Sequence, residues 1–256
     1  MIGCARWIAS LVLATRFLTI VPVPGREAAG PGALGRAAWW FPAIGLALGG
    51  GLMLADRVLA TLVPPLLSAG LVVAVWKVLT GGIHLDGLAD CLDGLAGANA
   101  EGRLAIMRDS RIGVFGALGL ALCLLIACAA LSGTPAGARA PILLLAPAVG
   151  RLTPLLVGPR VRPATPGQGL GAAFLAKLPR AAGPVWLAVL LVLAWLLLGP
   201  TGAAMAVGAL VAGAGGAVVF ARRLGGLTGD ALGAGVELSE LAWLVLGASC
   251  AHRNLI

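Results

Sequence analysis

Long apolar runs alternate with polar stretches along almost the whole chain. A helix that crosses a membrane needs about 20 predominantly apolar residues, and most of the runs approach that length. The runs cover residues 38–55, 58–79, 114–132, 140–158, 184–199, 201–220 and 236–251. This pattern predicts an all-α, polytopic membrane helix bundle with about six to seven transmembrane helices. We expect it to form a single domain over residues 1–256.

The apolar run at the N-terminus differs from the others. It extends from Trp7 to Pro24 and is interrupted by Arg16. A cleavable signal peptide has an uninterrupted apolar centre and a small-residue cleavage site, and neither is clear here. We therefore expect a retained membrane-associated segment, either re-entrant or lying in the interface.

The composition favours a membrane protein over the other classes. Hydrophobic residues make up 60% of the chain and charged residues 11%, and the mean hydropathy is +1.02. A soluble domain carries about 25% charged residues. Tyr is absent, which argues against an outer-membrane barrel with aromatic girdles. The five Cys form no CxxC pair and no Cys/His spacing, so neither a zinc site nor a disulfide framework is predicted.

The basic residues indicate the orientation of the bundle. The net charge of +8 would suggest nucleic-acid binding in a soluble protein, but here the cations flank the apolar runs. If the 80–113 stretch faces the cytoplasm, fourteen Lys and Arg fall inside, whereas Arg57, Arg139 and Arg253 fall outside and Arg151 lies within a span. Such an excess marks the cytoplasmic side. We therefore predict a multi-pass protein of the cell inner membrane with no nucleic-acid partner.

This orientation places three polar stretches, residues 80–113, 159–183 and 222–235, on the cytoplasmic face, where they could form a single site. Eight of the ten acidic residues fall in or just after the first and third of these stretches. They are Asp86, Asp90, Asp93, Glu101, Asp109, Asp230, Glu237 and Glu240. Carboxylates concentrated beside a membrane are costly unless a cation neutralises them.

The first acidic cluster has helical spacing. Asp86, Asp90 and Asp93 are four and three residues apart, so they share one helix face. Oxygen-only ligation indicates a hard divalent ion, and Mg²⁺ typically combines one or two carboxylates with substrate phosphates. The alternative is a solvated acidic helix end. His84 can be a helix-start residue, a general base or a phosphate donor.

Two further motifs suit a phosphate ligand. Arg108 and Arg111 flank Asp109 and Ser110. The planar guanidinium group of Arg donates two parallel hydrogen bonds that match phosphate oxygens. Asp109 could complete the set of ligands around a metal ion. The alternative is that this motif only caps the following helix and that its Arg residues set the orientation in the membrane. The Gly-rich segment 224–235 contains Thr228, Gly229 and Asp230, and its glycines allow backbone amides to approach an anion. Glu237 and Glu240 follow it with a spacing of three.

The motifs resemble, in order, the signature of the cobalamin-5'-phosphate synthase family, also called the adenosylcobinamide-GDP ribazoletransferases. The similarity rests on Gly81-Gly-Ile-His-Leu-Asp-Gly-Leu-Ala-Asp90 with Asp93-Gly94, on Ile106-Met-Arg-Asp-Ser-Arg-Ile-Gly113, and on Gly225-Gly-Leu-Thr-Gly-Asp230. The runs Thr15–Pro24 and Trp40–Gly45 match as well, so the resemblance covers most of the chain.

The resemblance implies an integral membrane enzyme that joins adenosylcobinamide-GDP to α-ribazole, or to its 5'-phosphate, and releases GMP with Mg²⁺. It implies Asp86, Asp90 and Asp93 as metal ligands, joined by Asp230 or Glu237. Asp93, His84 and Asp109 become the candidate catalytic residues, with Asp93 favoured as the base. Arg108, Ser110 and Arg111 are expected to bind the pyrophosphate, and Thr228 and Gly229 a phosphate or the nucleotide. Homo-oligomerisation is left open.

Two alternatives remain at this point. A CDP-alcohol phosphotransferase of lipid synthesis also uses clustered Asp at a membrane face. Its usual motif has Arg directly after the Ala, whereas in this chain Ala89 is followed by Asp90. A cation transporter would also contain membrane carboxylates, although here they gather at one face and no inverted repeat is visible.

Overall fold

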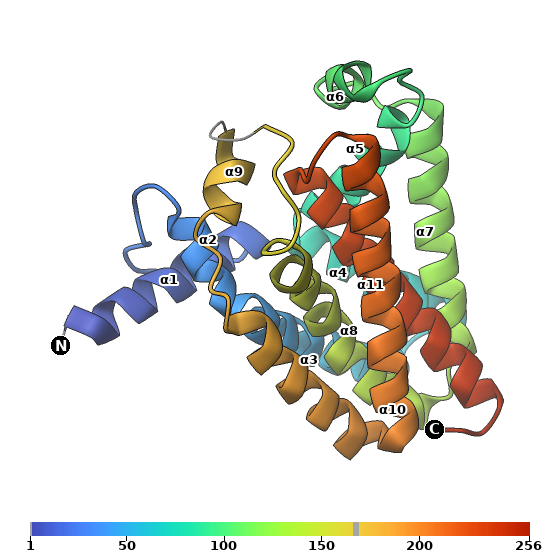
Figure 1. Ribbon diagram of the computed structural model, residues 1–256. Coiled ribbons are helices and arrows are strands. Elements are labelled where there is room, and N and C mark those ends of the chain that lie inside the picture. Colours follow the sequence, from blue (N-terminus) through green and yellow to red (C-terminus); the bar gives the residue numbers. More distant parts are fainter. Residues whose placement is uncertain (1, 166–168) are drawn as a thin grey trace.

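The computed structural model describes residues 2–165 and 169–256, and Figure 1 shows the arrangement of their helices. The elements are α1 (Ile2–Leu18), α2 (Ala33–Ala37), the short 3-10 helix η1 (Ala38–Trp40), α3 (Phe41–Leu59), α4 (Pro65–Leu79), α5 (Ile83–Gly94), α6 (Ala100–Met107), α7 (Val114–Gly133), α8 (Ala136–Val157), α9 (Gly169–Leu175), α10 (Ala182–Arg223) and α11 (Gly229–His252). Within the described residues, five helical stretches are long and apolar enough to cross a membrane. A sixth span arises if α4 and α5, which meet at 90°, are counted together. The predicted all-α polytopic bundle is confirmed.

The long helix α10 is a helical hairpin. Gly199 adopts φ 66° and ψ −165°, which interrupts the helix just before Pro200. The chain reverses there, at the lower end of Figure 1. The arms approach so closely that a Cβ on Gly202 would collide with the carbonyl oxygen of Ala194. The arms correspond to the runs predicted at 184–199 and 201–220.

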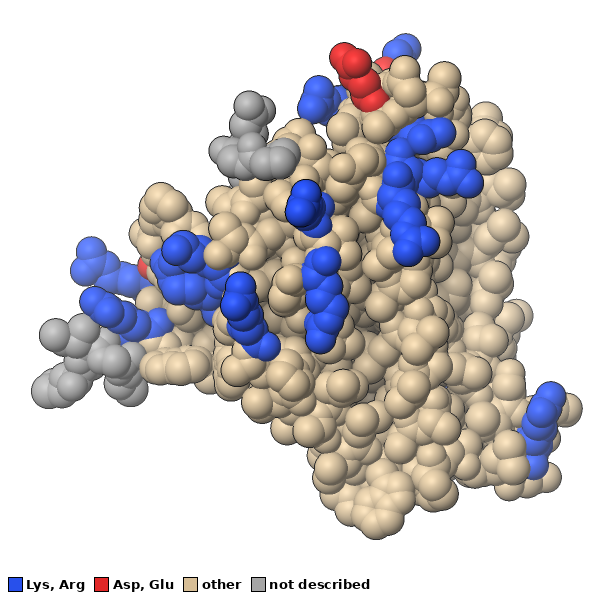
Figure 2. All heavy atoms as spheres, viewed as in Figure 1, with Lys and Arg blue, Asp and Glu red and all other residues tan. Residues whose placement is uncertain are grey.

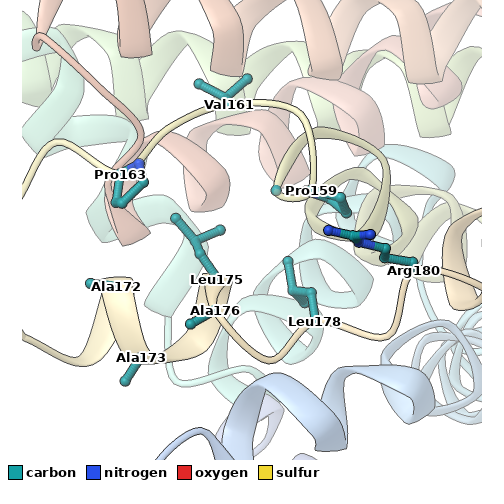
Figure 3. Close-up of a pocket in the computed structure, with 10 residues that line it drawn as sticks. Pro159, Val161, Pro163, Ala172, Ala173, Leu175, Ala176, Leu178 and Arg180 are labelled. Atoms are coloured by element: carbon teal, nitrogen blue, oxygen red, sulfur yellow. The ribbon is translucent and has the colours of Figure 1, made fainter. Parts of the chain in front are cut away.

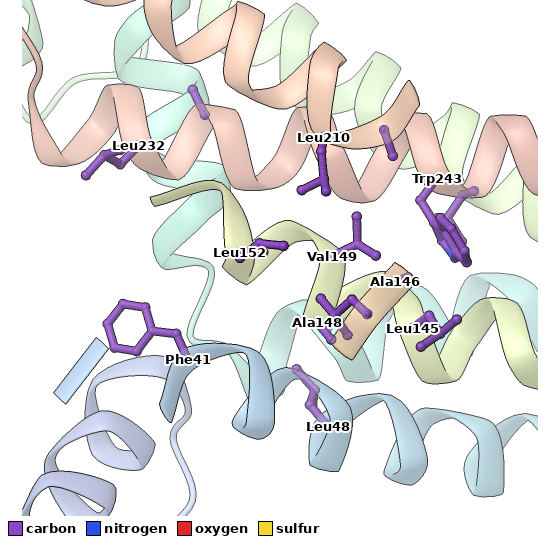
Figure 4. Packing of buried hydrophobic residues seen from close by; sticks show 14 of the residues in the cluster. Phe41, Leu48, Leu145, Ala146, Ala148, Val149, Leu152, Leu210, Leu232 and Trp243 are labelled. Carbon is purple, nitrogen blue, oxygen red and sulfur yellow. The ribbon is translucent and has the colours of Figure 1, made fainter. Parts of the chain in front are cut away.

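Helix α8 occupies the centre of the bundle and packs against α3, α10 and α11. Its side chains are buried almost without interruption from Ile142 to Val157. Figure 4 shows Leu145, Val149 and Leu152 of this helix among apolar side chains of its neighbours. Contact with α3 is close because Gly45 lacks a side chain: a Cβ there would lie 2.5 Å from the Cα of Ala148. Small residues at membrane helix contacts allow this approach.

The three long polar stretches meet at one end of the bundle, as predicted. Arg103 Nη1 donates to the carbonyl of Arg223 at 2.9 Å, which joins the first stretch to the third. Leu227 N donates to the carbonyl of Arg162 at 2.8 Å, which joins the third to the second. In Figure 2, most of the Lys and Arg visible on this side of the molecule lie toward the end that carries α6 and α9.

The opposite end holds the C-terminus and the turns that follow α3 and α7 (Figure 1). Asp56 and Arg139, both buried, form an ion pair there. Arg139 is one of the three cations predicted to lie away from the cytoplasmic side.

The N-terminal segment lies beside the bundle. Trp7 of α1 makes edge-on contacts with Trp39 and Trp40, with ring centroids 6.1 and 5.6 Å apart. Trp186 of α10 donates to the carbonyl of Trp39 at 2.8 Å, which fixes this aromatic group to the helices. Trp rings are enriched at membrane interfaces. This arrangement agrees with the expected membrane-associated segment.

Candidate active site

The position of α5 is set by a tight turn after α4. Gly81 and Gly82 have φ values of 61° and 67°, in the left-handed region that glycine adopts without strain. The turn bends the chain by 90°, and α5 then runs against the first turns of α11. A Cβ on Gly87 would lie 2.8 Å from the carbonyl oxygen of Asp230, so the two backbones touch. This contact brings the first acidic segment to the second.

Three carboxylates gather where α5 and α11 meet. Asp86 is exposed, whereas Asp90 and Asp230 are half-buried. Asp90 experiences the negative charges of both others and of Asp93. Among the described residues, none of Asp86, Asp90 and Asp230 forms an ion pair with Lys or Arg. The group therefore carries an uncompensated negative charge at the polar end of the bundle.

This donor set fits a hard divalent cation by its chemistry, because carboxylate oxygens are the ligands that Mg²⁺ takes. In the described part of the chain, no three such side chains are already gathered at coordinating distance. A cation would therefore have to draw Asp86, Asp90 and Asp230 together, with the remaining ligands coming from water and substrate.

Asp93 has a different environment from its neighbours on α5. Its carboxylate accepts hydrogen bonds from Gly113 N and Gly116 N, both at 2.8 Å, at the start of α7. The first backbone amides of a helix lack partners within it, and a carboxylate there also interacts favourably with the helix dipole. Asp93 thus anchors α5 to α7 with both of its oxygens.

Glu237 lies in a buried ion network, not beside the aspartates. Lys77 Nζ contacts Glu237 Oε1 and Oε2 at 2.9 and 2.6 Å, and Glu240 Oε2 at 3.1 Å. Arg151, which is fully buried, donates to Glu240 Oε1 at 2.8 Å. The network ties α4, α8 and α11 together, and it uses both carboxylate oxygens of the predicted metal ligand Glu237.

The predicted pyrophosphate-binding motif lies in the exposed connection between α6 and α7. Arg111 Nη2 donates to Asp109 Oδ2 at 2.6 Å. Hydrogen bonds from Arg111 lower the pKa of Asp109 to about 2. Arg108 and Ser110 are exposed on the same connection. The structure thus pairs Asp109 with Arg111, whereas Arg108 lies exposed and has no ion pair with any other described residue.

Thr228 and Gly229 begin α11. Thr228 Oγ1 accepts a hydrogen bond from Ala231 N at 3.0 Å, which caps the helix. Leu227, just before the cap, forms an isolated bridge with Pro163. The Gly-rich turn therefore lies against the second polar stretch.

A cavity of about 370 Å³ adjoins the acidic group. Both His84 and Asp230 line it, so the structure brings two predicted site residues to one space. His84 is held in place by α11, because its backbone lies 3.4 Å from where a Cβ on Gly233 would be. The sequence analysis did not assign a role to the aromatic lining residues Phe17, Phe41 and Phe174. The first two lie in the N-terminal runs that carry the family resemblance.

A second cavity, of about 510 Å³, opens between α9 and the segment after α8 (Figure 3). Its lining is mostly apolar, with Val161, Leu175 and Leu178 around it and the cationic side chain of Arg180 at one side. It lies at the same end of the molecule as the acidic group, and its mixed lining suits part of a large amphipathic ligand.

Comparisons with known proteins give a consistent family for the chain. The family model described as cobalamin-5-phosphate synthase matches residues 10–248. An adenosylcobinamide-GDP ribazoletransferase of Ectopseudomonas mendocina is 41% identical over 245 residues, which cover 91% of this chain and 96% of that protein. Enzymes of the same name from Syntrophobacter fumaroxidans and Desulfitobacterium hafniense are 40% and 37% identical, each over 93% of this chain and over 97% and 95% of their own lengths.

No solved structure matches the chain significantly. The similarity in sequence nevertheless runs through all the motifs described above, from the N-terminal runs to α11. It favours an enzyme of cobalamin biosynthesis over the lipid phosphotransferase and the transporter that were considered as alternatives. The chain belongs to the cobalamin-5-phosphate synthase family and is a membrane transferase of cobalamin biosynthesis.

Proposed function

We propose that this transferase joins adenosylcobinamide-GDP to α-ribazole or its 5'-phosphate and releases GMP, in a Mg²⁺-dependent reaction. The relatives' names supply the donor and the ribazole group. The observation that carries the proposal is the group of Asp86, Asp90 and Asp230, which has no cationic partner among the described residues. Such a group suits a reaction in which a cation and a diphosphate arrive together.

In this reaction a free ribose hydroxyl of the acceptor attacks the phosphorus that carries the cobinamide group. A new P–O bond forms, the bond to the GMP oxygen breaks, and GMP leaves with the electron pair. When bound, Mg²⁺ supplies charge neutralisation for the diphosphate. Asp86, Asp90 and Asp230 are the residues that would hold it.

The proton of the attacking hydroxyl needs an acceptor near the acidic group. His84 lines the adjoining cavity together with Asp230. It is the better candidate for this base than Asp93, because both Asp93 oxygens already accept hydrogen bonds from α7. Arg108, on the exposed connection before α7, is suited to a diphosphate oxygen.

The reaction requires both substrates at the polar end of the bundle. Because the cations concentrate there, we propose that this end faces the cytoplasm and that the enzyme lies in the cell inner membrane.

The test is an assay of GMP release by purified enzyme in lipid vesicles. Asp90→Asn should lower kcat by about 10²-fold or more with an unchanged melting temperature, since it removes a charge that the cation needs. Chelation of divalent ions should abolish wild-type turnover, and added Mg²⁺ should restore it. A CDP-linked donor should give no product. Near-normal turnover of Asp90→Asn would remove the acidic group from the reaction.

A further inference from the structure

Three aromatic rings from three different helices form a column in the wall of the 370 Å³ cavity. The rings of Phe17 and Phe41 are 5.9 Å apart with an interplanar angle of 15°, and those of Phe41 and Phe174 are 6.0 Å apart at 19°. The rings stack on one another, so the column, built from α1, α3 and α9, offers ring edges and its outer faces to the cavity. Flat aromatic ligands pack favourably against ring edges as well as ring faces.

The rest of the lining is apolar apart from two side chains. His84 on α5 and Asp230 on α11 are the polar side chains in it, and no Lys or Arg is among the described lining residues. Figure 4 shows two of the apolar ones, Phe41 on α3 and Leu232 on α11. A phosphate or diphosphate would find no cationic partner in this lining, so the lining favours a largely apolar, uncharged group.

The size of the cavity narrows the choice of ligand. Cavities that enclose small molecules have volumes of roughly 300–1,000 Å³, so this one lies at the lower end. It is suited to a bicyclic ring but not to a corrin macrocycle. Because Asp230 is assigned to the cation in the proposed function, His84 alone would have to satisfy the several donors and acceptors on the edge of guanine. A benzimidazole, whose ring offers one free nitrogen, fits this lining.

We propose that this cavity is the acceptor site, in which Phe17, Phe41 and Phe174 contact the benzimidazole base of the ribazole. The inference rests on the proposed function, because the ribazole acceptor comes from there. It makes the three Phe residues specificity-determining residues for the base. The base lies against the aromatic column, and the ribose hydroxyls extend toward His84 and Asp230, where the acidic group begins.

Two variants test the site. Gly171 lines the cavity, and a Cβ there would meet only Gly229 N, at 3.7 Å, so Gly171→Leu adds volume without a backbone collision. Phe174→Ala removes one ring of the column. Both should raise the KM for α-ribazole by about tenfold while the KM for the GDP-linked donor stays within about twofold, since aromatic contacts of this kind contribute about that much. Phe174→Ala should also improve the relative use of a wider naphthimidazole riboside.

The control is Gly51→Leu. Gly51 is exposed on α3 and has no atom within 4 Å of a Cβ, so this variant makes the same change away from the cavity. It should leave both KM values unchanged. Melting temperatures of all variants show whether they are folded, and Phe174→Leu is a milder substitute if Phe174→Ala is not.

A binding measurement separates this inference from the proposed reaction. Equilibrium dialysis of labelled α-ribazole with the enzyme in detergent needs no donor and no turnover. Binding to wild type that weakens about tenfold in Gly171→Leu, but not in Gly51→Leu, supports the site. Equal binding to all three proteins overturns it, even if wild type releases GMP normally. Failure of wild type to release GMP, with the cavity-dependent binding intact, would instead reject the proposed reaction.

Discussion

At the scale of single residues, three aspartates of similar spacing have different surroundings. Asp86 and Asp90 belong to the acidic group together with Asp230, whereas Asp93 accepts two backbone hydrogen bonds from the start of α7. The sequence predicts that all three share a helix face, and they do lie on one helix. It does not predict that Gly113 and Gly116 come to meet Asp93, because that depends on how α7 packs against α5.

Asp93→Asn should destabilise the fold. The amide offers one acceptor oxygen in place of two, and it carries no negative charge to interact with the dipole of α7. We therefore expect the free energy of unfolding to fall by about 1–2 kcal/mol. The measurement is the melting temperature of the enzyme in detergent. Asp90→Asn is the matched control and should melt like wild type. Equal melting temperatures for Asp93→Asn and wild type would contradict a structural role for Asp93.

The pKa of Asp109 gives a second prediction at this scale. Hydrogen bonds from Arg111 lower that pKa to about 2, so the carboxylate stays ionised at every pH well above 2. Because the pKa is depressed, any contribution of the pair is present at neutral pH and is lost only as the pH falls toward 2. The ratio of wild-type to Asp109→Asn kcat/KM should therefore be constant from about pH 5 to pH 9. A ratio that changes within this window would show that Asp109 titrates during turnover.

At the scale of helices, the most consequential interaction is the buried network of Lys77, Arg151, Glu237 and Glu240. Two cations and two anions balance one another inside the bundle, where isolated charges are costly. The family resemblance implied Glu237 as a possible metal ligand. It did not reveal that Lys77, 160 positions earlier, reaches the same place.

Lys77→Met should be strongly destabilising. It leaves Glu237 without its cation and weakens the pairing of Glu240, and breaking a buried pair in this way costs about 3–5 kcal/mol. Thermal unfolding in detergent measures the effect. Lys77→Arg, which keeps the charge, should retain most of the stability, and Arg111→Met at the exposed surface should change it little. A melting temperature of Lys77→Met close to that of wild type would show that the network does not hold the helices.

At the scale of the whole molecule, the apolar pattern was sufficient to predict a helical bundle, the meeting of the polar stretches and the break near Gly199. Each follows from the length of a membrane helix and from the positions of polar residues. The aromatic column was not predicted. Phe17, Phe41 and Phe174 lie far apart in the sequence, and a Phe in an apolar run has no pattern that separates a ligand contact from ordinary packing.

The proposed orientation predicts where the ends of the molecule lie. A fluorescent protein inserted after Ala98, in the exposed turn before α6, should fluoresce because it stays in the cytoplasm. Alkaline phosphatase fused after Ile256 should be active, because that end lies opposite the acidic group (Figure 1) and outside the cell membrane. With the two reporters exchanged, the fluorescent protein after Ile256 should not fluoresce and the alkaline phosphatase after Ala98 should be inactive. Activity in the reverse pattern would invert the orientation.

The reversal at Gly199 has a further consequence. Its two arms join without a loop, and the other connections at that end, residues 60–64 and 134–135, are also short. In the proposed orientation, the enzyme thus exposes little to the outside of the cell. Both substrates would then arrive, and both products would leave, on the cytoplasmic side, where neighbouring enzymes supply and consume them.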